Sequence, residues 1–162
     1  MRTSLFSLTD RYALVTGGAS AIGLAIAEAF QEHGAQVVAS RNEAKVFSAV
    51  SQHNGNGAKE DRHDVVGLKV DVTSDAMVEH AIAPFVSRFG GIDVVVNAAG
   101  YTSLKPSLER NPSEYNQFFD THVSGSFRCA KASAIWRKKN GQGSLSNVAS
   151  IASCVALLDA AP

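Results

Sequence analysis

The chain has 162 residues, of which 45% are hydrophobic and 19% are charged. This balance is typical of a globular protein and excludes an intrinsically disordered one, and the length predicts a single domain over residues 1–162. Fifteen basic residues balance fifteen acidic ones, so no overall charge favours nucleic acid or an anionic membrane as a partner. The sequence has two cysteines, no secretory signal and no apolar run of roughly 18 residues, so a cytoplasmic protein is expected.

Short β-branched runs alternate with helical stretches along the chain. The β-branched runs predict five strands, at residues 12–16, 36–40, within 65–72, 92–96 and 144–149. A helical stretch follows each of the first four strands, and this repeat predicts a parallel sheet with right-handed crossovers. The expected fold is α/β, a doubly wound parallel sheet with the strand order 3-2-1-4-5.

The first three helical stretches have recognisable ends. The first is expected to stop at Gly34, and its apolar face comprises Ile22, Ala25, Ile26, Ala29 and Phe30. A weaker helix is predicted from Asn42 to about His53, before a polar surface loop over residues 53–64. The third helix spans residues 75–89 with Thr73 or Ser74 as its N-cap, and a kink is expected at Pro84.

A fourth, long helix is predicted over residues 112–139, with Ser113 as its cap. Its apolar residues lie on two sides, which indicates that the helix is buried on two sides. One side can cover the sheet, and the other predicts a neighbouring helix or a second subunit. A homo-oligomer formed through helix 112–139 is therefore one expectation; simple exposure of some of these aromatic residues is the alternative.

A glycine-rich stretch, TGGASAIG, joins the first strand to the first helix. Glycines allow the backbone to turn sharply and to approach a phosphate closely, and the start of the helix offers free N–H groups to a pyrophosphate. The position between strand and helix is what this motif requires for nucleotide binding. The predicted cofactor-binding residues here are Thr16, Gly17, Ser20, Ala21, Ile22 and Gly23.

The second strand ends in Ser40, Arg41 and Asn42, where a dinucleotide fold meets the adenosine ribose. A carboxylate at this place binds the 2′-hydroxyl of NAD, whereas an arginine favours a 2′-phosphate. Arg41 therefore predicts that NADP(H) is preferred and that NAD(H) is the second choice. In the alternative interpretation, Arg41 is only a solvated residue at the end of a strand.

Four motifs in order make the chain resemble the short-chain dehydrogenase/reductase family. The glycine-rich stretch resembles the family's TGxxxGxG motif, with Ala21 in place of the middle glycine, a small change that is expected to be tolerated. Asp71 and Val72 resemble the pair that holds the adenine ring, and SLSNVAS over residues 144–150 resembles the strand that carries the catalytic serine. The family's NNAG motif corresponds to Asn97, Ala98, Ala99 and Gly100.

This resemblance implies a Rossmann-type domain and an NAD(P)(H)-dependent oxidoreductase. The family reaction transfers hydride between a nicotinamide and a small-molecule carbonyl or alcohol substrate, which here includes alcohols, sugars, polyols and oxoacyl compounds. Ser150 is then the serine that hydrogen-bonds the substrate oxygen. His122 stands where the family has a catalytic asparagine; it either relays a proton or is a buried histidine bonded to a backbone carbonyl.

The family's Tyr-x-x-x-Lys motif, expected roughly a dozen residues after the serine, has no counterpart in residues 151–162. The five-strand fold is therefore expected to be incomplete and the isolated chain inactive. The alternative function is a catalytically inactive nucleotide-binding or interaction module. Scattered histidines predict no metal site, and Cys129 and Cys154 are expected to be small buried side chains.

Overall fold

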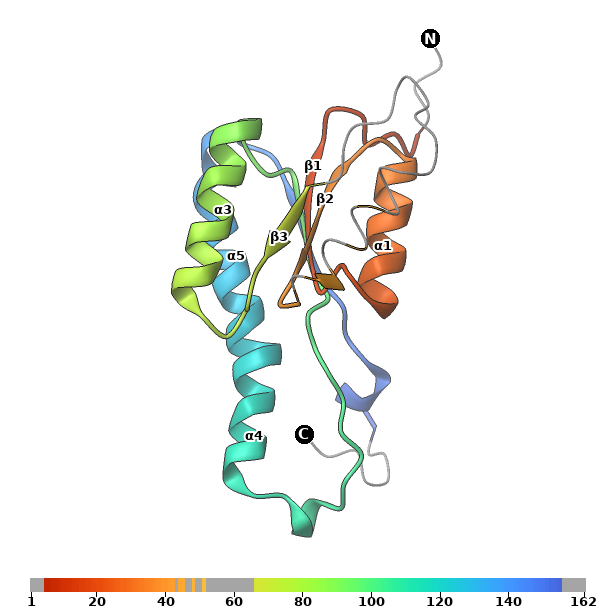
Figure 1. Ribbon diagram of the computed structural model, residues 1–162, viewed down its shortest axis with the longest axis vertical. Helices are drawn as coiled ribbons and strands as arrows, with labels where there is room; N and C mark the ends of the chain where they lie inside the picture. Colours follow the sequence, from red (N-terminus) through yellow and green to blue (C-terminus); the bar gives the residue numbers. More distant parts are fainter. Residues whose placement is uncertain (1–4, 43, 46–47, 49–50, 52–65, 156–162) are drawn as a thin grey trace.

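A computed structural model describes residues 5–42, 44–45, 48, 51 and 66–155 of the chain. Five parallel strands form one sheet in the order β3-β2-β1-β4-β5, which is the order expected from the sequence (Figure 1). The strands are β1 (Tyr12–Thr16), β2 (Gln36–Ser40), β3 (Gly67–Lys69), β4 (Val94–Asn97) and β5 (Ser144–Asn147). The third strand is only three residues long, shorter than the region predicted for it.

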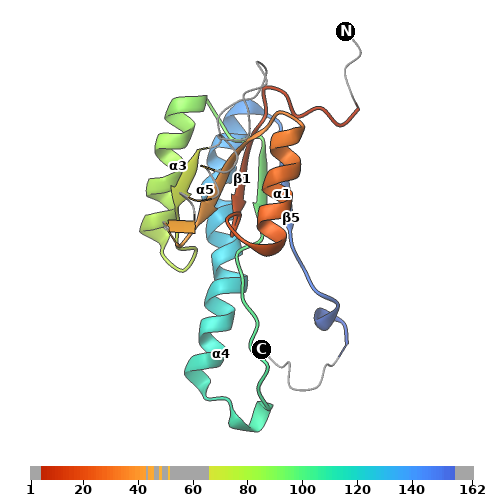
Figure 2. The same cartoon turned by 45° about the vertical axis from the view of Figure 1, so that its right-hand side comes forward.

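Helices cover both faces of the sheet (Figures 1 and 2). Helix α1 (Ala21–Glu32) lies on one face, and α3 (Asp75–Phe89) and α5 (Gly125–Asn140) lie on the other. Successive residues of a strand point to opposite faces, so β1 and β4 contribute to two cores. Val15 and Val96 pack in the core that contains Ala27 of α1, whereas Leu14 and Val95 join the core formed with α3 and α5.

Helix α1 packs through smaller residues than its apolar pattern predicts. Gly23 and Ala27 are its buried residues, whereas Ile22 is 62% exposed and Ala25 and Ala29 are also exposed. The predicted face of this helix was therefore partly wrong. A Cβ at Gly23 would clash with the carbonyl oxygen of Gly17, because the helix lies very close to the turn that precedes it. This close contact requires small residues, so the face with Gly23 and Ala27 is the one that is buried.

The predicted long helix is interrupted. Helix α4 (Pro112–Phe119) is followed by a π-helical turn, η2 (Asp120–Ser124), and only then by α5. The N-cap of α4 is Asn111 and not Ser113: the Asn111 side chain accepts the N–H of Glu114, whose carboxylate accepts the N–H of Asn111 in return. Such a reciprocal pair satisfies two N–H groups at a helix start.

Other helix predictions have mixed outcomes. Ser74 caps α3, which continues as one helix through Pro84. The weaker helix predicted from Asn42 to about His53 and the loop over residues 53–64 lie largely outside the described residues. None of the described helices combines the length and the apolar composition needed to cross a membrane.

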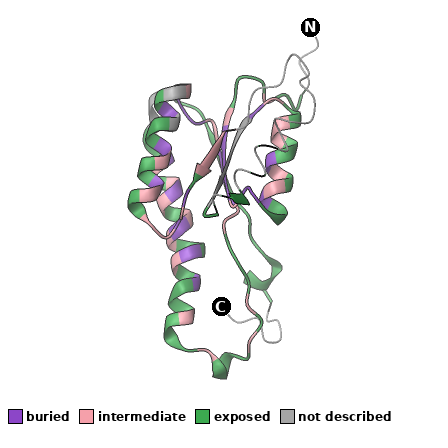
Figure 3. Ribbon diagram, viewed as in Figure 1, coloured by how far each residue is buried: buried purple, intermediate pink, exposed green. Residues whose placement is uncertain are grey.

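The segments after β4 and β5 extend beyond the sheet on the side of α4 (Figures 1 and 2). They contain two short 3-10 helices, η1 (Ser107–Glu109) and η3 (Ile151–Ser153). Figure 3 shows these segments and α4 as mostly exposed, whereas buried residues concentrate around the sheet. The end of the sheet from which these segments emerge is where the predicted site residues gather.

Candidate functional site

The glycine-rich turn and the segment after β4 are in direct contact. Gly17 has φ +70°, and a Cβ at this position would lie 2.8 Å from the carbonyl oxygen of Ala98 and 2.9 Å from Cα of Ala99. Only glycine adopts this backbone conformation readily and leaves room for the neighbouring chain. Two of the motifs recognised in the sequence are therefore one structural unit at the carboxyl ends of β1 and β4.

The hydroxyl of Thr16 joins these two motifs. It lies 3.2 Å from the amide nitrogens of both Ala98 and Ala99, and 3.4 Å from the carbonyl oxygen of Val96, to which it donates. Thr16 is 2% exposed. The sequence predicts Thr16 as a cofactor ligand, but these contacts make it a buried residue that holds the segment after β4.

The start of α1 offers main-chain N–H groups to an anion. The first N–H groups of any α-helix have no partner within the helix. Ser20 is the N-cap and makes no side-chain capping bond, and the first turn contains no acidic residue. Together with the close backbone approach at Gly17 and Gly23, these features fit the diphosphate of a dinucleotide.

Arg41, Asn42 and Asp71 follow the neighbouring strands β2 and β3 at the same edge of the sheet. Arg41 is exposed, and the Asn42 side chain accepts the N–H of Lys45 at 3.0 Å. The side chain of Ser40 lies outside the described residues. Burial alone would raise the pKa of Asp71, but hydrogen bonds from Thr73, with the charges of Arg41 and Arg128, hold that pKa below 3.8. Asp71 is therefore ionised at neutral pH and lies within electrostatic reach of Arg41.

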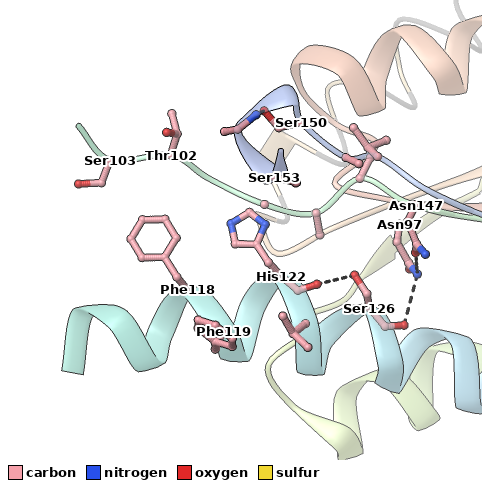
Figure 4. Close-up of a pocket in the computed structure, with 17 residues that line it drawn as sticks. Asn97, Thr102, Ser103, Phe118, Phe119, His122, Ser126, Asn147, Ser150 and Ser153 are labelled. Carbon is pink, nitrogen blue, oxygen red and sulfur yellow. Dashed lines mark hydrogen bonds between the residues drawn. The ribbon is translucent and has the colours of Figure 1, made fainter. Parts of the chain in front are cut away.

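A cavity of about 760 Å³ opens next to this edge (Figure 4). Its walls come from the segments after β4 and β5 and from α4, η2 and the first turn of α5. Asn97, Ala98, Ala99 and Gly100 all line it, as do His122 and Ser150. The structure thus brings both predicted catalytic residues to one cavity.

Ser150 is the N-cap of η3, and its Oγ accepts the N–H of Ala152 at 3.2 Å. A hydroxyl that accepts one bond still has its own hydrogen to donate. Ser150 is exposed on the cavity wall. The arrangement therefore leaves the Ser150 hydroxyl able to donate to an oxygen atom in the cavity.

His122 lies in the π-helical turn, and its ring packs against the segment after β4. Its Nε2 lies 2.9 Å from the carbonyl oxygen of Tyr101 and 3.4 Å from the Tyr101 amide nitrogen; it donates to the first when it carries the hydrogen and accepts from the second when it does not. The ring also stacks on Phe118, and a Cβ at Gly100 would lie 2.5 Å from Cε1 of the imidazole. His122 is exposed and not buried, and its ring lies against the backbone of Tyr101.

Asn147 and Ser126 also belong to the site, although no sequence motif predicted them. Asn97 and Asn147 are partners in the register of β4 and β5, and Nδ2 of Asn97 donates to Oδ1 of Asn147 at 2.9 Å and to the carbonyl of Ser126 at 3.3 Å. The Ser126 hydroxyl donates to the carbonyl of His122 at 2.7 Å (Figure 4). The sequence feature that could have predicted this pair is an asparagine at the end of each of two neighbouring strands.

The two cysteines do not line the cavity. Burial raises the pKa of the Cys129 thiol to about 11, so this cysteine is neutral and packs in the core as expected. Cys154 is exposed, contrary to the prediction that it is buried. Within the described part of the chain, no group of three or more His, Cys, Asp or Glu side chains is arranged to hold a metal ion. Among the described residues that line the cavity, none is a tyrosine or a lysine.

Comparisons with known proteins show the family to which the chain belongs. The sequence model of the short chain dehydrogenase family matches residues 11–161, and the chain belongs to the short-chain dehydrogenase/reductase family. The family's cofactor is an NAD(P), and its members are oxidoreductases that act on small molecules.

Individual relatives agree with this class. D-threitol dehydrogenase of Mycolicibacterium smegmatis is 35% identical over 152 residues, which are 94% of this chain and 57% of the relative. A 3-oxoacyl-[acyl-carrier-protein] reductase of Vibrio cholerae is 31% identical over 145 residues, covering 90% of this chain and 57% of that protein. The crystal structure of a short-chain type dehydrogenase/reductase from Mycobacterium marinum superposes with a TM-score of 0.86 at 30% identity, covering 94% and 61% of the two chains. The chain thus spans about three fifths of the length of these proteins.

Proposed function

We propose that the chain binds NADP(H) for an oxidoreductase reaction that transfers hydride between the nicotinamide and a carbonyl or alcohol substrate. One observation carries this proposal: the glycine turn before α1 packs on the segment after β4, beside a cavity lined by Ser150 and His122. When bound, the dinucleotide supplies or accepts the hydride. Relatives named for a polyol and for an oxoacyl compound keep both substrate classes in the proposal.

The described residues have separate roles in this proposal. Main-chain N–H groups between Gly17 and Gly23 bind the diphosphate, and Asp71 and Val72 bind the adenine. The segment from Asn97 to Gly100 forms the wall beside the nicotinamide. Ser150 donates its free hydroxyl hydrogen to the substrate oxygen, which orients the carbonyl group. His122 holds the backbone of Tyr101 and thereby the shape of the cavity wall.

Arg41 supports a preference for NADP(H) over NAD(H). It is exposed at the carboxyl end of β2, and its charge acts on Asp71 at the end of β3. A guanidinium in this place favours the 2′-phosphate of NADP(H), to which it can donate two hydrogen bonds. NAD(H) lacks this phosphate and is proposed to bind more weakly.

The test replaces Arg41 and measures the affinity of the chain for NADPH and NADH by fluorescence titration. Arg41→Asp is expected to raise the Kd for NADPH by roughly tenfold or more, because a charge-assisted hydrogen bond is lost, and to favour NADH. Lys45→Asp makes the same charge change nearby and is expected to leave the order of the two affinities unchanged. An Arg41→Asp protein that still prefers NADPH would disprove the role of Arg41.

A second candidate function is a nucleotide-binding module without turnover. The described residues of the cavity wall include no tyrosine and no lysine, the residue types of the family's Tyr-x-x-x-Lys motif, and this observation favours the second candidate. We propose that these 162 residues bind the cofactor without reducing carbonyls. NADPH consumption over a panel of aldehydes, ketones and sugars tests this, and measurable turnover by the chain would contradict it.

We also propose that a second copy of the chain packs on exposed apolar residues of α4, the π-helical turn and α5. Five exposed apolar residues at spacings of four or eight form a stripe along these elements: Tyr115, Phe119, Val123, Phe127 and Ile135. Phe119 and Val123 of this stripe also line the cavity. The opposite side of α5 is buried, with Cys129 in the core. An isologous dimer covers such a stripe with the same stripe of the partner.

A further inference from the structure

Arg128 lies in the first turn of α5 and is absent from the cavity wall and from the predicted motifs. Its side chain is only 19% exposed. Nε donates to the Asp75 carboxylate at 3.2 Å, and Nη1 donates to the carbonyl oxygen of Val72 at 3.2 Å. Nη1 also lies 2.8 Å from Oδ1 of Asp120. One guanidinium therefore connects the turn before α3, the start of α3 and the start of the π-helical turn.

Val72 is held from two directions by the first turn of α5. Its carbonyl accepts from Arg128, and its side chain packs against Gly125, where a Cβ would lie 2.8 Å from Cγ2 of Val72. Residues three apart lie on one face of a helix, so Gly125 and Arg128 form one contact surface. Val72 is buried as a result of this packing and of its place in the core.

The same guanidinium holds the π-helical turn at its first residue. Besides the Asp120 carboxylate, Nη1 lies 3.3 Å from the Asp120 carbonyl oxygen, which also accepts the N–H of Gly125. A long side chain on a helix points back toward the helix N-terminus, which allows Arg128 to reach across the turn. The hydrogen bond to Asp120 and the charges of Asp120 and Asp75 raise the pKa of Arg128, so the guanidinium stays charged.

The π-helical turn bears on the site because it forms part of the cavity wall. His122 and Val123 of this turn line the cavity, as does Ser126, two residues after the turn. Val72 comes after β3, at the side of the sheet where Arg41 and Asp71 lie. The loop from β3 to α3 passes beside the junction of α4 and α5 (Figure 1). Arg128 is therefore the side chain that joins these two sides of the site.

We propose that Arg128 is a positioning residue that fixes Val72 against the π-helical turn, and thereby aligns the adenine side of the cofactor site with the cavity. The statement about adenine rests on the proposed function, in which Asp71 and Val72 bind that ring. The statement about the π-helical turn rests only on the contacts of Arg128.

The test compares Arg128→Met, Arg128→Lys and Lys131→Met in the full chain. Lys131→Met is the matched control, because it removes one exposed positive charge from the same helix. Hydrogen exchange of the amides of residues 120–126 reports the π-helical turn. Fluorescence titration with NADPH and displacement by adenosine 2′,5′-bisphosphate report the adenine side, with each Kd referred to the folded fraction measured by circular dichroism.

Arg128→Met is expected to speed exchange over residues 120–126 and to weaken both NADPH and adenosine 2′,5′-bisphosphate by about tenfold, since charge-assisted bonds are lost. Arg128→Lys is expected to restore part of the affinity, and Lys131→Met to match the parent chain in every measurement. Should Arg128→Met fail to fold, Asp120→Asn, which removes one carboxylate charge, is expected to show the same two changes.

Parent-like exchange and affinity in Arg128→Met would overturn the proposal. Faster exchange with an unchanged Kd would overturn the link between Arg128 and the cofactor site. An equal loss of NADPH affinity in Lys131→Met would show that any positive charge on this helix has the same effect, and this result would also overturn the proposal. If the parent chain binds no NADPH at all, the proposed function fails instead. The exchange experiment then still decides whether Arg128 holds the π-helical turn.

Discussion

Ala21 is the residue at which this chain departs from the glycine motif, and the backbone there has φ +48°. An L-residue in the left-handed region places its Cβ too close to the next carbonyl, at a cost of roughly 1–2 kcal/mol. The small size of the methyl group predicts that alanine is tolerated at this position. In the structure, alanine lowers the stability through its left-handed backbone conformation and not through the size of its side chain.

Ala21→Gly is therefore expected to stabilise the chain by about 1 kcal/mol, because glycine adopts this conformation without strain. Urea denaturation followed by circular dichroism measures the free energy of unfolding. Ala25→Gly, at an exposed position inside the same helix, is the matched control and is expected to destabilise by about 1 kcal/mol. A loss of stability in Ala21→Gly would show that the left-handed conformation is not strained.

At the scale of elements, the turn from β3 to α3 depends on an ionised carboxylate. Oδ1 of Asp71 accepts the N–H of Thr73 at 3.0 Å and its hydroxyl at 2.7 Å. These bonds favour the charged form over the neutral form, which outweighs the opposite effect of burial on the pKa. The folded chain thus binds this proton less readily than the unfolded chain does.

The sign of the pH dependence follows from the lowered pKa of Asp71. Its contribution to stability is present at pH values above the ordinary value of 3.8 and is lost as pH falls through the lower pKa of the folded state. Thr73→Val is expected to cost about 1 kcal/mol at pH 6 and less near pH 3, measured by urea denaturation. Thr102→Val, at an exposed loop threonine, is expected to change little at either pH. Equal losses for Thr73→Val at both pH values would disprove the link to ionisation.

At the scale of the whole molecule, the interruption between α4 and α5 affects the exposed stripe. Four residues advance about 400° around an α-helix, so a stripe with spacing four drifts by about 40° at each step. A π-helical turn has more residues per turn and reduces this drift between Phe119 and Phe127. The interruption lies within the stripe, and Phe119 and Val123 also line the cavity, so the proposed interface would adjoin the cavity.

Phe127→Glu is expected to convert a dimeric chain into a monomer, because it places a charge at a residue that is 67% exposed in the stripe. Sedimentation equilibrium measures the mass in solution. Leu108→Glu is the matched control, since Leu108 is fully exposed in η1 and lies outside the stripe. A parent chain that is monomeric at all concentrations would contradict the dimer.

Local sequence determined the alternation of strands and helices, the glycine turn and the family. These features depend on hydrophobic periodicity and on short motifs, which act over a few neighbouring residues. Tyr12–Thr16, Gln36–Ser40 and Asp75–Phe89 were predicted with their observed bounds for this reason. The cap of α3 at Ser74 is also local, because a side chain and an N–H three residues later make it.

Only the tertiary structure decided which residues meet. The hydroxyl of Thr16 binds a segment 82 residues further along the chain, and Arg128 reaches Val72 across 56 residues. The buried face of α1 depends on contact with Gly17, and the break in the long helix coincides with contacts of Gly125 and Arg128 to Val72. Hydrophobic pattern carries no information about such pairings, because their energy comes from packing and hydrogen bonds between segments that are distant in sequence.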